Sequence, residues 1–516
     1  MNNNLQMVYT YHNETKHAPQ RYAKSLGYMD WATQPDPYRS YNDTKKIDLV
    51  LSFHNNTPIY KDIFDLQKND IAPLCLESIS QFFQFSLGLA AIKSFEEQSW
   101  ALRCNASSGN LQPTESYFVA NEVEGIDDGL YHYAVKDHQL ELLANAKEKF
   151  DLPKDSFLVG LSSIVWREAW KYGERSWRYT QLDCGHAYKA LEISAKILGW
   201  QIQLVDTEDA DLESLLGLND LKRYVPEETE HADMLLIVSK STQKQSVDIQ
   251  KLRNSLQDEY EGKANILSSS RHNWEILEKI ETAVSTTPSK QPLHLSEQNS
   301  FRECLYASKE VVLKRRSAQV MNKDYATIIQ TQFENILQSV VTQEKNPVHL
   351  VLFVHSVENL TPGLYILLGD KDSKDTLSRA VKESFIWDKV EGNVDNLYLL
   401  QDGDFKYTAK TISCSQDIAA HGAFSLGMLV EFDKQIQEHG AHRYKELYWQ
   451  CGAIGQQLYL EATSLHLSAT GIGCFLDDVM HDMLGLKNSA YQSLYHFTIG
   501  RGLVDKRLTD EEPYTK

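Results

Sequence analysis

Two short segments of the chain carry side chains that could bind a flat, polar cofactor and its phosphate. Residues 103–115 form a turn of small and hydroxyl-bearing residues ahead of an expected strand, and residues 314–317 form a basic cluster with a hydroxyl. Hydroxyl and amide groups can hydrogen-bond the polar edge of a ring system, whereas paired guanidinium groups can bind a phosphate. The candidate cofactor ligands are Ser107, Ser108, Asn110, Arg315, Arg316 and Ser317.

The turn resembles a flavin-contacting segment of the nitroreductase family, and it is most similar to the SagB-type branch. That branch usually has Arg-x-Asn-Pro-Ser-Ser-Gly-Asn-x-x-Pro-Thr-Glu, and Ala106 stands here in place of the proline. The cluster Arg315-Arg316-Ser317 is similar to the family's phosphate-binding signature, with Gln319 where a second basic residue is frequent. The resemblance implies flavin mononucleotide (FMN) as the cofactor.

Two further segments resemble flavin-contacting parts of the same family. Gly471-Ile472-Gly473 is similar to a glycine-rich segment over the flavin ring, where the missing side chains let the backbone approach closely. Arg501 lies between two glycines and matches a basic residue that reaches the phosphate. Taken alone, Gly-Ile-Gly is no dinucleotide fingerprint, because the third glycine and the βαβ context are missing.

Lys171 and Tyr172 begin a motif that is similar to a stretch of SagB-type dehydrogenases. The motif runs through Arg178-Tyr179 to Asp183-Cys184-Gly185-His186. The resemblance implies that Lys171 and Tyr172 are catalytic: an amine shielded from water can remove a proton while hydride leaves to flavin N5, and the tyrosine can relay or orient. The alternative is that Lys171 is solvated and that Glu174 and the neighbouring arginines form a surface ion-pair network.

Length and composition indicate an ordinary soluble globular protein with more than one domain. The 516 residues are 42% hydrophobic and 24% charged, and a single core rarely serves so long a chain. The net charge of -19 argues against a nucleic-acid surface, which requires Lys and Arg. Without a membrane-spanning apolar run or a targeting pattern, we expect a cytoplasmic protein with no membrane partner. The cysteine and histidine spacings indicate no metal site.

The chain repeats itself, which indicates two copies of one fold. Cys184-Gly185 aligns with Cys451-Gly452 at an offset of 267 residues, and Leu216-Gly217-Leu218 aligns with Leu484-Gly485-Leu486 at an offset of 268. Matches in the same order at nearly constant offset are typical of a duplication. The expected parts are an N-terminal domain at residues 1–240, a polar and partly helical connector at 241–298, and a C-terminal domain at 299–516.

Each copy shows the same coarse pattern of helices and strands. Apolar residues at three- and four-residue steps predict a long core helix over residues 182–198 and again over 447–465. Apolar and alternating runs predict strands at 117–120, 130–133 and 234–238 in the first copy, and at 348–354, 363–367 and 496–499 in the second. We expect an α+β fold in which helices flank an antiparallel-rich sheet.

The two copies differ in the cofactor-binding motif that they retain. The first has the turn at Ser107 but no arginine pair near residues 58–68, and the second has the arginine pair but only residues 342–347 where the turn would be. In nitroreductase-like dimers the two motifs come from different subunits, so the resemblance implies that the tandem chain forms an intrachain pseudo-dimer. We expect one composite site with one FMN per chain, in a monomer or in a homodimer of such chains.

The resemblance implies an FMN-dependent oxidoreductase of the SagB-type, nitroreductase-like family. The reaction would be a two-electron hydride transfer through flavin N5, such as oxidation of an azoline or a related bond in a peptide-derived or small-molecule substrate. One alternative is an NAD(P)H-dependent reductase of nitro compounds or quinones, because the family binds nicotinamide at the same flavin face. Another is a non-catalytic scaffold of a biosynthetic complex that has kept the fold.

Overall fold

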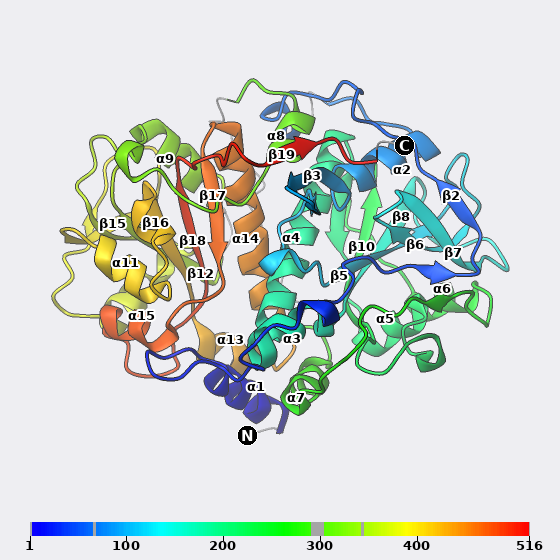
Figure 1. Ribbon diagram of the computed structural model, residues 1–516, viewed down its shortest axis with the longest axis horizontal. Coiled ribbons are helices and arrows are strands. Elements are labelled where there is room, and N and C mark those ends of the chain that lie inside the picture. The colour runs from blue at the N-terminus through cyan, green and yellow to red at the C-terminus, as the bar shows by residue number, and fades with distance from the viewer. Residues whose placement is uncertain (1–2, 66–68, 290–303, 342–344, 515–516) are drawn as a thin grey trace. The chain divides into compact units, whose positions relative to one another are not determined.

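The computed structural model describes residues 3–65, 69–289, 304–341 and 345–514 (Figure 1). Contacts within this part of the chain divide it into two compact units. The N-terminal unit comprises the described residues of 24–292, 306–313 and 507–516, and the C-terminal unit comprises those of 1–23, 293–305 and 314–506. No helix within the described ranges is both long enough and apolar enough to cross a membrane.

The N-terminal unit is built on a seven-stranded antiparallel sheet. Its strands lie in the order β2-β7-β6-β5-β8-β10-β9. Their bounds are β2 (Lys46–Asp48), β5 (Thr114–Ala120), β6 (Gly129–Ala134), β7 (Gln139–Asn145), β8 (Ser156–Ser163), β9 (Gln201–Leu204) and β10 (His231–Ser239). The long helix α4 (Ser176–Ile197) packs against β5, β8 and β9. Every residue of β5 and β8 is buried, so both faces of the sheet centre are covered.

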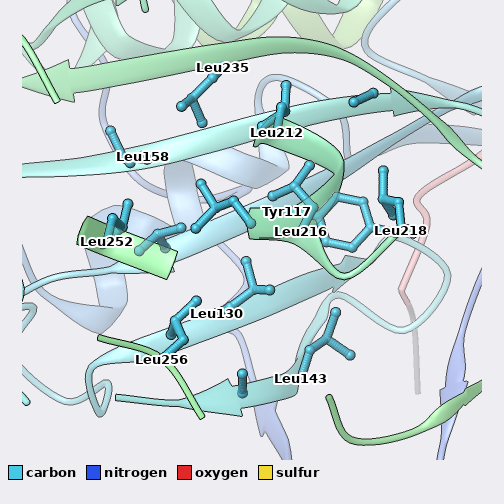
Figure 2. Packing of buried hydrophobic residues seen from close by; sticks show 14 of the residues in the cluster. Tyr117, Leu130, Leu143, Leu158, Leu212, Leu216, Leu218, Leu235, Leu252 and Leu256 are labelled. Carbon is cyan, nitrogen blue, oxygen red and sulfur yellow. The ribbon is translucent and has the colours of Figure 1, made fainter. Parts of the chain in front are cut away.

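Helices α5 (Asp209–Leu216) and α6 (Ile249–Asn254) contribute to a leucine-rich core beside this sheet. Figure 2 shows the leucines of the two helices lying with leucines of the sheet in one buried cluster. The labelled members include Leu158, Leu212, Leu216, Leu235 and Leu252. Burial of a leucine side chain contributes about 1.5–3 kcal/mol, so this cluster is a main source of stability for the unit.

The C-terminal unit repeats the arrangement. Its seven antiparallel strands lie in the order β14-β15-β13-β12-β16-β18-β17. Their bounds are β12 (Val348–Val354), β13 (Gly363–Leu367), β14 (Asp388–Lys389), β15 (Leu397–Asp402), β16 (Phe424–Val430), β17 (Ser468–Ile472) and β18 (Gln492–Gly500). The long helix α14 (Arg443–Ser464) packs against β17 and β18, and α15 (Asp477–Leu484) packs against β18 as α5 packs against β10.

The agreement between the two units confirms the duplication. α4 and α14 each contain 22 residues. α5 and α15 each contain eight residues and are followed by a left-handed glycine, Gly217 or Gly485, which ends a helix at little steric cost. Both units have the expected α+β architecture, with helices flanking an antiparallel sheet.

Shorter helices complete the fold, and α3 is the one that matters most for the candidate site. The remaining helices are α2 (Leu76–Gln84), α3 (Val165–Tyr172), α7 (Glu275–Val284), α8 (Ser308–Lys314), α9 (Gln330–Gln338), α10 (Lys374–Ala380), α11 (Lys406–Ile412), α12 (Ile418–His421) and α13 (Phe432–His439). α3 packs directly against the neighbouring helix α4.

The two ends of the chain each belong to the unit of the opposite copy. Helix α1 (Asn3–Glu14) is part of the C-terminal unit, where His12 hydrogen-bonds Tyr444 at 3.0 Å and Gln492 at 2.9 Å. Strand β19 (Thr509–Glu511) is part of the N-terminal unit, where it pairs with β3 (Leu89–Phe95). Tyr514 then donates to the carbonyl of Val135 at 2.8 Å.

The residues expected to form a connector pack, where they are described, with the N-terminal unit. They include α6, α7 and the short strand β11 (Lys263–Ala264), which pairs with β1 (Tyr41–Asn42). Trp177 of α4 donates its indole N–H to Glu281 of α7 at 2.7 Å. Residues 290–298 of the expected connector, its boundary at 299, and residues 342–344 lie outside the described residues.

Candidate functional site

The Ser107–Gln112 turn is a strained loop between β4 (Gln98–Arg103) and β5. Gly109, Asn110 and Gln112 have positive φ angles of 58°, 59° and 55°. This left-handed conformation costs a non-glycine residue about 1–2 kcal/mol. Such strain clusters at binding and catalytic sites, so the conformation of the turn marks it as a functional candidate.

Hydrogen bonds within the turn occupy the side chains that were expected to meet the cofactor. The hydroxyl of Ser107 accepts from the backbone amide of Gln112 at 2.9 Å. The side-chain amide of Asn110 donates to the carbonyl of Ala101 at 2.9 Å and accepts from Gln112 Nε2 at 3.0 Å. These side chains fix the shape of the turn, so its backbone groups are the better candidates for cofactor contact.

The carboxylate of Asp183, in α4, holds the turn in place by hydrogen bonds to Ser108. Both of its carboxylate oxygens accept from the backbone amide of Ser108 at 3.0 Å, and Oδ1 also accepts from the Ser108 hydroxyl at 2.9 Å. Burial raises the pKa of Asp183 to about 7, although the hydrogen bonds from Ser107 and Ser108 oppose the rise. Near neutral pH the Asp183 carboxyl group is therefore close to its pKa, so its protonated and ionised forms are both populated.

The predicted catalytic pair lies directly against the turn. Lys171 and Tyr172 end helix α3 and are half-buried. A Cβ atom placed on Gly109 would lie 2.6 Å from the Tyr172 hydroxyl and 3.2 Å from Lys171 Nζ. A side chain at this position would have to displace the ends of both residues, so the predicted catalytic pair and the predicted cofactor turn form one cluster within the N-terminal unit.

Arg167, one turn earlier in α3, joins this helix to the turn and to the strand behind it. Its fully buried guanidinium donates to the carbonyl of Gln112 at 2.7 Å and pairs with the Glu115 carboxylate. Burial opposes the ionisation of Glu115, but Arg167 and His132 outweigh it and lower the pKa of Glu115 to about 2. This buried ion pair positions α3, and with it the Lys171–Tyr172 pair, relative to the turn.

Glu168 lies on the same face of α3 as the predicted catalytic pair, three residues before Lys171 and four before Tyr172. Its side chain is completely buried, and among the described residues neither carboxylate oxygen has a hydrogen-bond partner. Burial, reinforced by Asp183, raises the pKa of Glu168 well above its usual range, although Lys171 opposes the rise. An ionised carboxylate without hydrogen bonds would be costly there, so the neutral acid is the stable form.

In the C-terminal unit, Tyr459 of α14 brings the basic cluster and the glycine segment together. Its hydroxyl shares a hydrogen bond of 2.8 Å with the Ser317 hydroxyl and accepts from the Gly471 amide at 2.8 Å. The guanidinium of buried Arg315 lies 5.2 Å from the centre of the Tyr459 ring, and Arg316 Nη1 donates to the Arg315 carbonyl at 2.8 Å. Arg315, the Ser317 hydroxyl and the edge strand β17 thus all contact the side chain of Tyr459.

The glycine segment has a structural role beside any cofactor contact. Gly471 and Ile472 end the edge strand β17, and a Cβ atom on Gly471 would overlap the hydroxyl of Tyr495. Ile472 is buried in the hydrophobic core of the unit, so only its backbone is available to a ligand. Gly473 follows the strand, and the Ala318 amide donates to the Ala469 carbonyl at 3.0 Å beside the basic cluster.

Arg501 lies beside the segment that follows the basic cluster. Its carbonyl accepts from the Asn322 amide at 2.7 Å, and its Nε donates to the Thr327 carbonyl at 3.3 Å. A Cβ atom on the adjacent Gly502 would lie 3.4 Å from the Ala318 side chain. The structure therefore places Arg501 next to the predicted phosphate-binding segment, with part of its guanidinium engaged by the backbone.

The predicted residues fall into two groups, one in each unit. Ser107, Ser108, Asn110, Lys171 and Tyr172 lie together in the N-terminal unit, and Arg315, Arg316, Ser317, Gly471, Ile472, Gly473 and Arg501 lie in the C-terminal unit. The sequence reasoning missed three further residues of these clusters: Arg167, Glu168 and Tyr459. For Glu168 a signal existed, because it shares a helix face with Lys171 and Tyr172.

Within the described ranges, no group of three or more His, Cys, Asp or Glu residues is placed to hold a metal.

Comparison with known proteins identifies the fold. Residues 346–501 match the model of the Nitroreductase family. The trifolitoxin-processing protein TfxB of Rhizobium leguminosarum bv. trifolii is 28% identical over 169 residues, an alignment that covers 29% of this chain and 45% of TfxB. The match thus spans less than half the length of that relative.

One solved structure extends the fold match over both copies. A protein of Anabaena variabilis assigned as a nitroreductase superposes with a TM-score of 0.69 at 21% identity, covering 96% of this chain and 99% of that one. Another, from Ralstonia eutropha, gives a TM-score of 0.29 at 14% identity over 43% of this chain and 93% of its own. The chain therefore carries a Nitroreductase-family domain at residues 346–501, and it has the nitroreductase fold in two tandem copies.

Proposed function

We propose that this protein is an FMN-dependent oxidoreductase of the SagB type that acts on a peptide-derived or small-molecule substrate. The observation that carries the proposal is the contact of Lys171 and Tyr172 with Gly109 of the strained turn. An amine and a phenol lie there beside a backbone segment that could contact a planar cofactor. The name of the relative TfxB, a trifolitoxin-processing protein, supports a role in processing a precursor.

The residues present suit FMN. A phosphate needs cationic, multidentate donors, which Arg315, Arg316 and Ser317 offer at the edge of β17. The isoalloxazine ring needs hydrogen-bonding backbone on a fixed loop, and the Ser107–Gln112 turn is fixed by its own side chains and by Asp183. When bound, FMN would supply a two-electron acceptor or donor for hydride.

The protein's own residues would handle the proton and the geometry. Lys171 Nζ would take a proton from the substrate, and the Tyr172 hydroxyl would orient the substrate or relay that proton. Gly109 keeps room for both groups. Arg167 would hold α3 in place by its bonds to Gln112 and Glu115. Because each copy retains a different motif, we propose one FMN per chain, in a monomer or in a homodimer of such chains.

Cofactor content is the first test. The chain should be purified without added flavin, its visible spectrum recorded, and the FMN released by heat quantified per chain; about one equivalent is expected. Arg316→Ala should lower this content, whereas Arg379→Ala, which removes an exposed arginine of the same unit, should not. A colourless protein that also fails to take up added FMN would overturn the proposal, as would two tightly bound FMN for the single site.

Catalysis is tested separately from cofactor binding. Lys171→Ala should keep FMN but lower turnover by about 100-fold or more, the usual range for loss of a general base. Lys147→Ala, which removes a more exposed lysine of the same unit, is the matched control. Azoline-containing model peptides test oxidation, and NADPH with a nitroaromatic compound or a quinone tests reduction. A Lys171→Ala variant with full turnover would remove Lys171 from the mechanism.

A further inference from the structure

Cys414 and Cys474 bring their sulfur atoms to 2.6 Å from one another in the C-terminal unit. This distance is shorter than van der Waals contact between two sulfur atoms, and it is longer than the bond of about 2.0 Å in a disulfide. Both thiols are half-buried, whereas four of the other five cysteines, Cys104, Cys184, Cys304 and Cys451, are buried. The pair is thus both in contact and within reach of a reagent.

The backbone around Cys414 is held in an unusual conformation. Cys414 and Ser415, in the loop between α11 and α12, have φ angles of 53° and 61°. Two consecutive non-glycine residues in the left-handed region are strained, and such strain persists only where surrounding contacts impose it. The contacts are present: Gln416 Nε2 donates to the Cys474 carbonyl at 3.2 Å, and the Leu476 amide donates to the Ile412 carbonyl at 2.7 Å. They keep the loop, and with it the Cys414 thiol, against Cys474.

We infer that Cys414 and Cys474 are a redox-active dithiol that small disulfides such as oxidised glutathione convert to an intramolecular disulfide. One cysteine thiolate attacks a sulfur of oxidised glutathione, forms a mixed disulfide and releases one glutathione. The second cysteine then attacks the protein sulfur of that mixed disulfide and releases the other glutathione. Overall the two cysteines lose two protons and two electrons, and both pass to the glutathione pair.

The location of the dithiol ties its state to the glycine segment. Cys474 directly follows Gly473, and Cys414 lies in a different loop, so the bond would restrain the end of the segment 471–473 against the α11–α12 loop. The formation of the disulfide does not depend on flavin binding. Any effect on FMN affinity does rest on the proposed function, so the bond itself must be measured directly.

The experiment uses the purified, full-length protein. After reduction and removal of the reductant, it is equilibrated in buffers with increasing ratios of oxidised to reduced glutathione. Free thiols are then alkylated, and the protein is digested without reduction for mass spectrometry. We expect a peptide pair linked through Cys414 and Cys474, with loss of two alkylatable thiols per chain and recovery of both when reduced glutathione is restored.

Cys75 is the internal control, because it is also half-buried and its thiol lies 3.5 Å from the hydroxyl of Ser78. It should stay alkylatable, or carry glutathione, under conditions that link the pair. Cys414→Ser and Cys474→Ser should each abolish the linked peptide, and Cys75→Ser should leave it unchanged. The inference fails if the wild-type thiols are alkylated at all ratios like Cys75, or if each carries glutathione without forming the link. These wild-type results require no folded variant.

Discussion

Asp183 and Ser108 are joined by the backbone amide and the hydroxyl of the serine, and both donate to the one carboxylate. The acceptor lies on a core helix and the donors lie on a surface turn. The shape of the turn is therefore linked to the packing of α4, and through α4 to α3 with Lys171 and Tyr172.

Asp183→Ala should destabilise the protein and disorder the turn. The change leaves the Ser108 amide and hydroxyl without their acceptor, and a buried unsatisfied donor costs about 1–3 kcal/mol. Urea denaturation should show a loss of free energy of unfolding in this range, with a weaker affinity for added FMN. Ser108→Ala removes only the hydroxyl and should cost less. Equal losses for both variants would show that the bond to the amide contributes nothing.

Gly109→Ala should be more harmful than an alanine at another left-handed glycine. Gly109 and Gly27 have φ angles of 58° and 75°, but a Cβ atom on Gly27 would have no atom within 4 Å. Both variants carry the backbone strain of about 1–2 kcal/mol, whereas only Gly109→Ala also displaces Tyr172 and Lys171. The difference between their free energies of unfolding measures that displacement. Gly109→Ala should also lower turnover, and identical behaviour of the two variants would contradict the packing.

The stability contribution of Asp183 should fall as the pH rises. Burial raises the pKa of Asp183 in the folded state to about 7 from its usual 3.8, so between these pH values the folded protein binds more protons than the unfolded chain. The contribution of Asp183 to the free energy of unfolding is fully present below about pH 4 and is lost between about pH 4 and 7. It amounts at most to about 4 kcal/mol. Urea denaturation across this window should show the free energy of unfolding falling more steeply with pH in the wild type than in Asp183→Asn. A constant difference between the two would refute the raised pKa.

Glu168→Gln should be tolerated at neutral pH, because the amide resembles the protonated acid. We expect its free energy of unfolding at pH 7 to stay within about 1 kcal/mol of the wild type, whereas Glu168→Ala leaves a cavity and should cost more. Thermal and urea denaturation provide the measurement. A loss of several kcal/mol in Glu168→Gln alone would mean that the folded state requires the carboxylate.

The repeat and the apolar runs in the sequence predicted the architecture well. Runs of apolar side chains mark the segments that become buried strands and helices. The expected strand at 348–354 matches β12 residue for residue, and those at 117–120 and 234–238 lie within β5 and β10. The long helices were predicted to begin too late: α4 begins at Ser176 rather than 182, and α14 at Arg443 rather than 447. Their first turns mix buried charged and polar residues with aromatic ones, so hydrophobic periodicity does not mark them.

The site was predictable only in part, for a related reason. Ser107, Ser108 and Lys171 could be named because motifs mark them, and the structure brings them together. Whether a polar side chain points inward depends on tertiary packing, which spacing alone does not reveal. Glu168 and Asp183 therefore had no assigned role, and the side chain of Ile472, named with its motif, lies in the core.

The exchange of chain ends has a consequence for biosynthesis. The N-terminal unit uses Tyr514, whose hydroxyl accepts from the Leu89 amide and donates to the Val135 carbonyl, and the C-terminal unit uses His12 of α1. During translation, α1 has no sheet to pack against until the second copy has been synthesised. In the same way, β3 lacks its partner strand until β19 has left the ribosome. The first copy thus cannot complete its fold before the second has been synthesised. A stop codon after the first copy would leave the N-terminal unit without β19 and Tyr514, and α1 without its sheet.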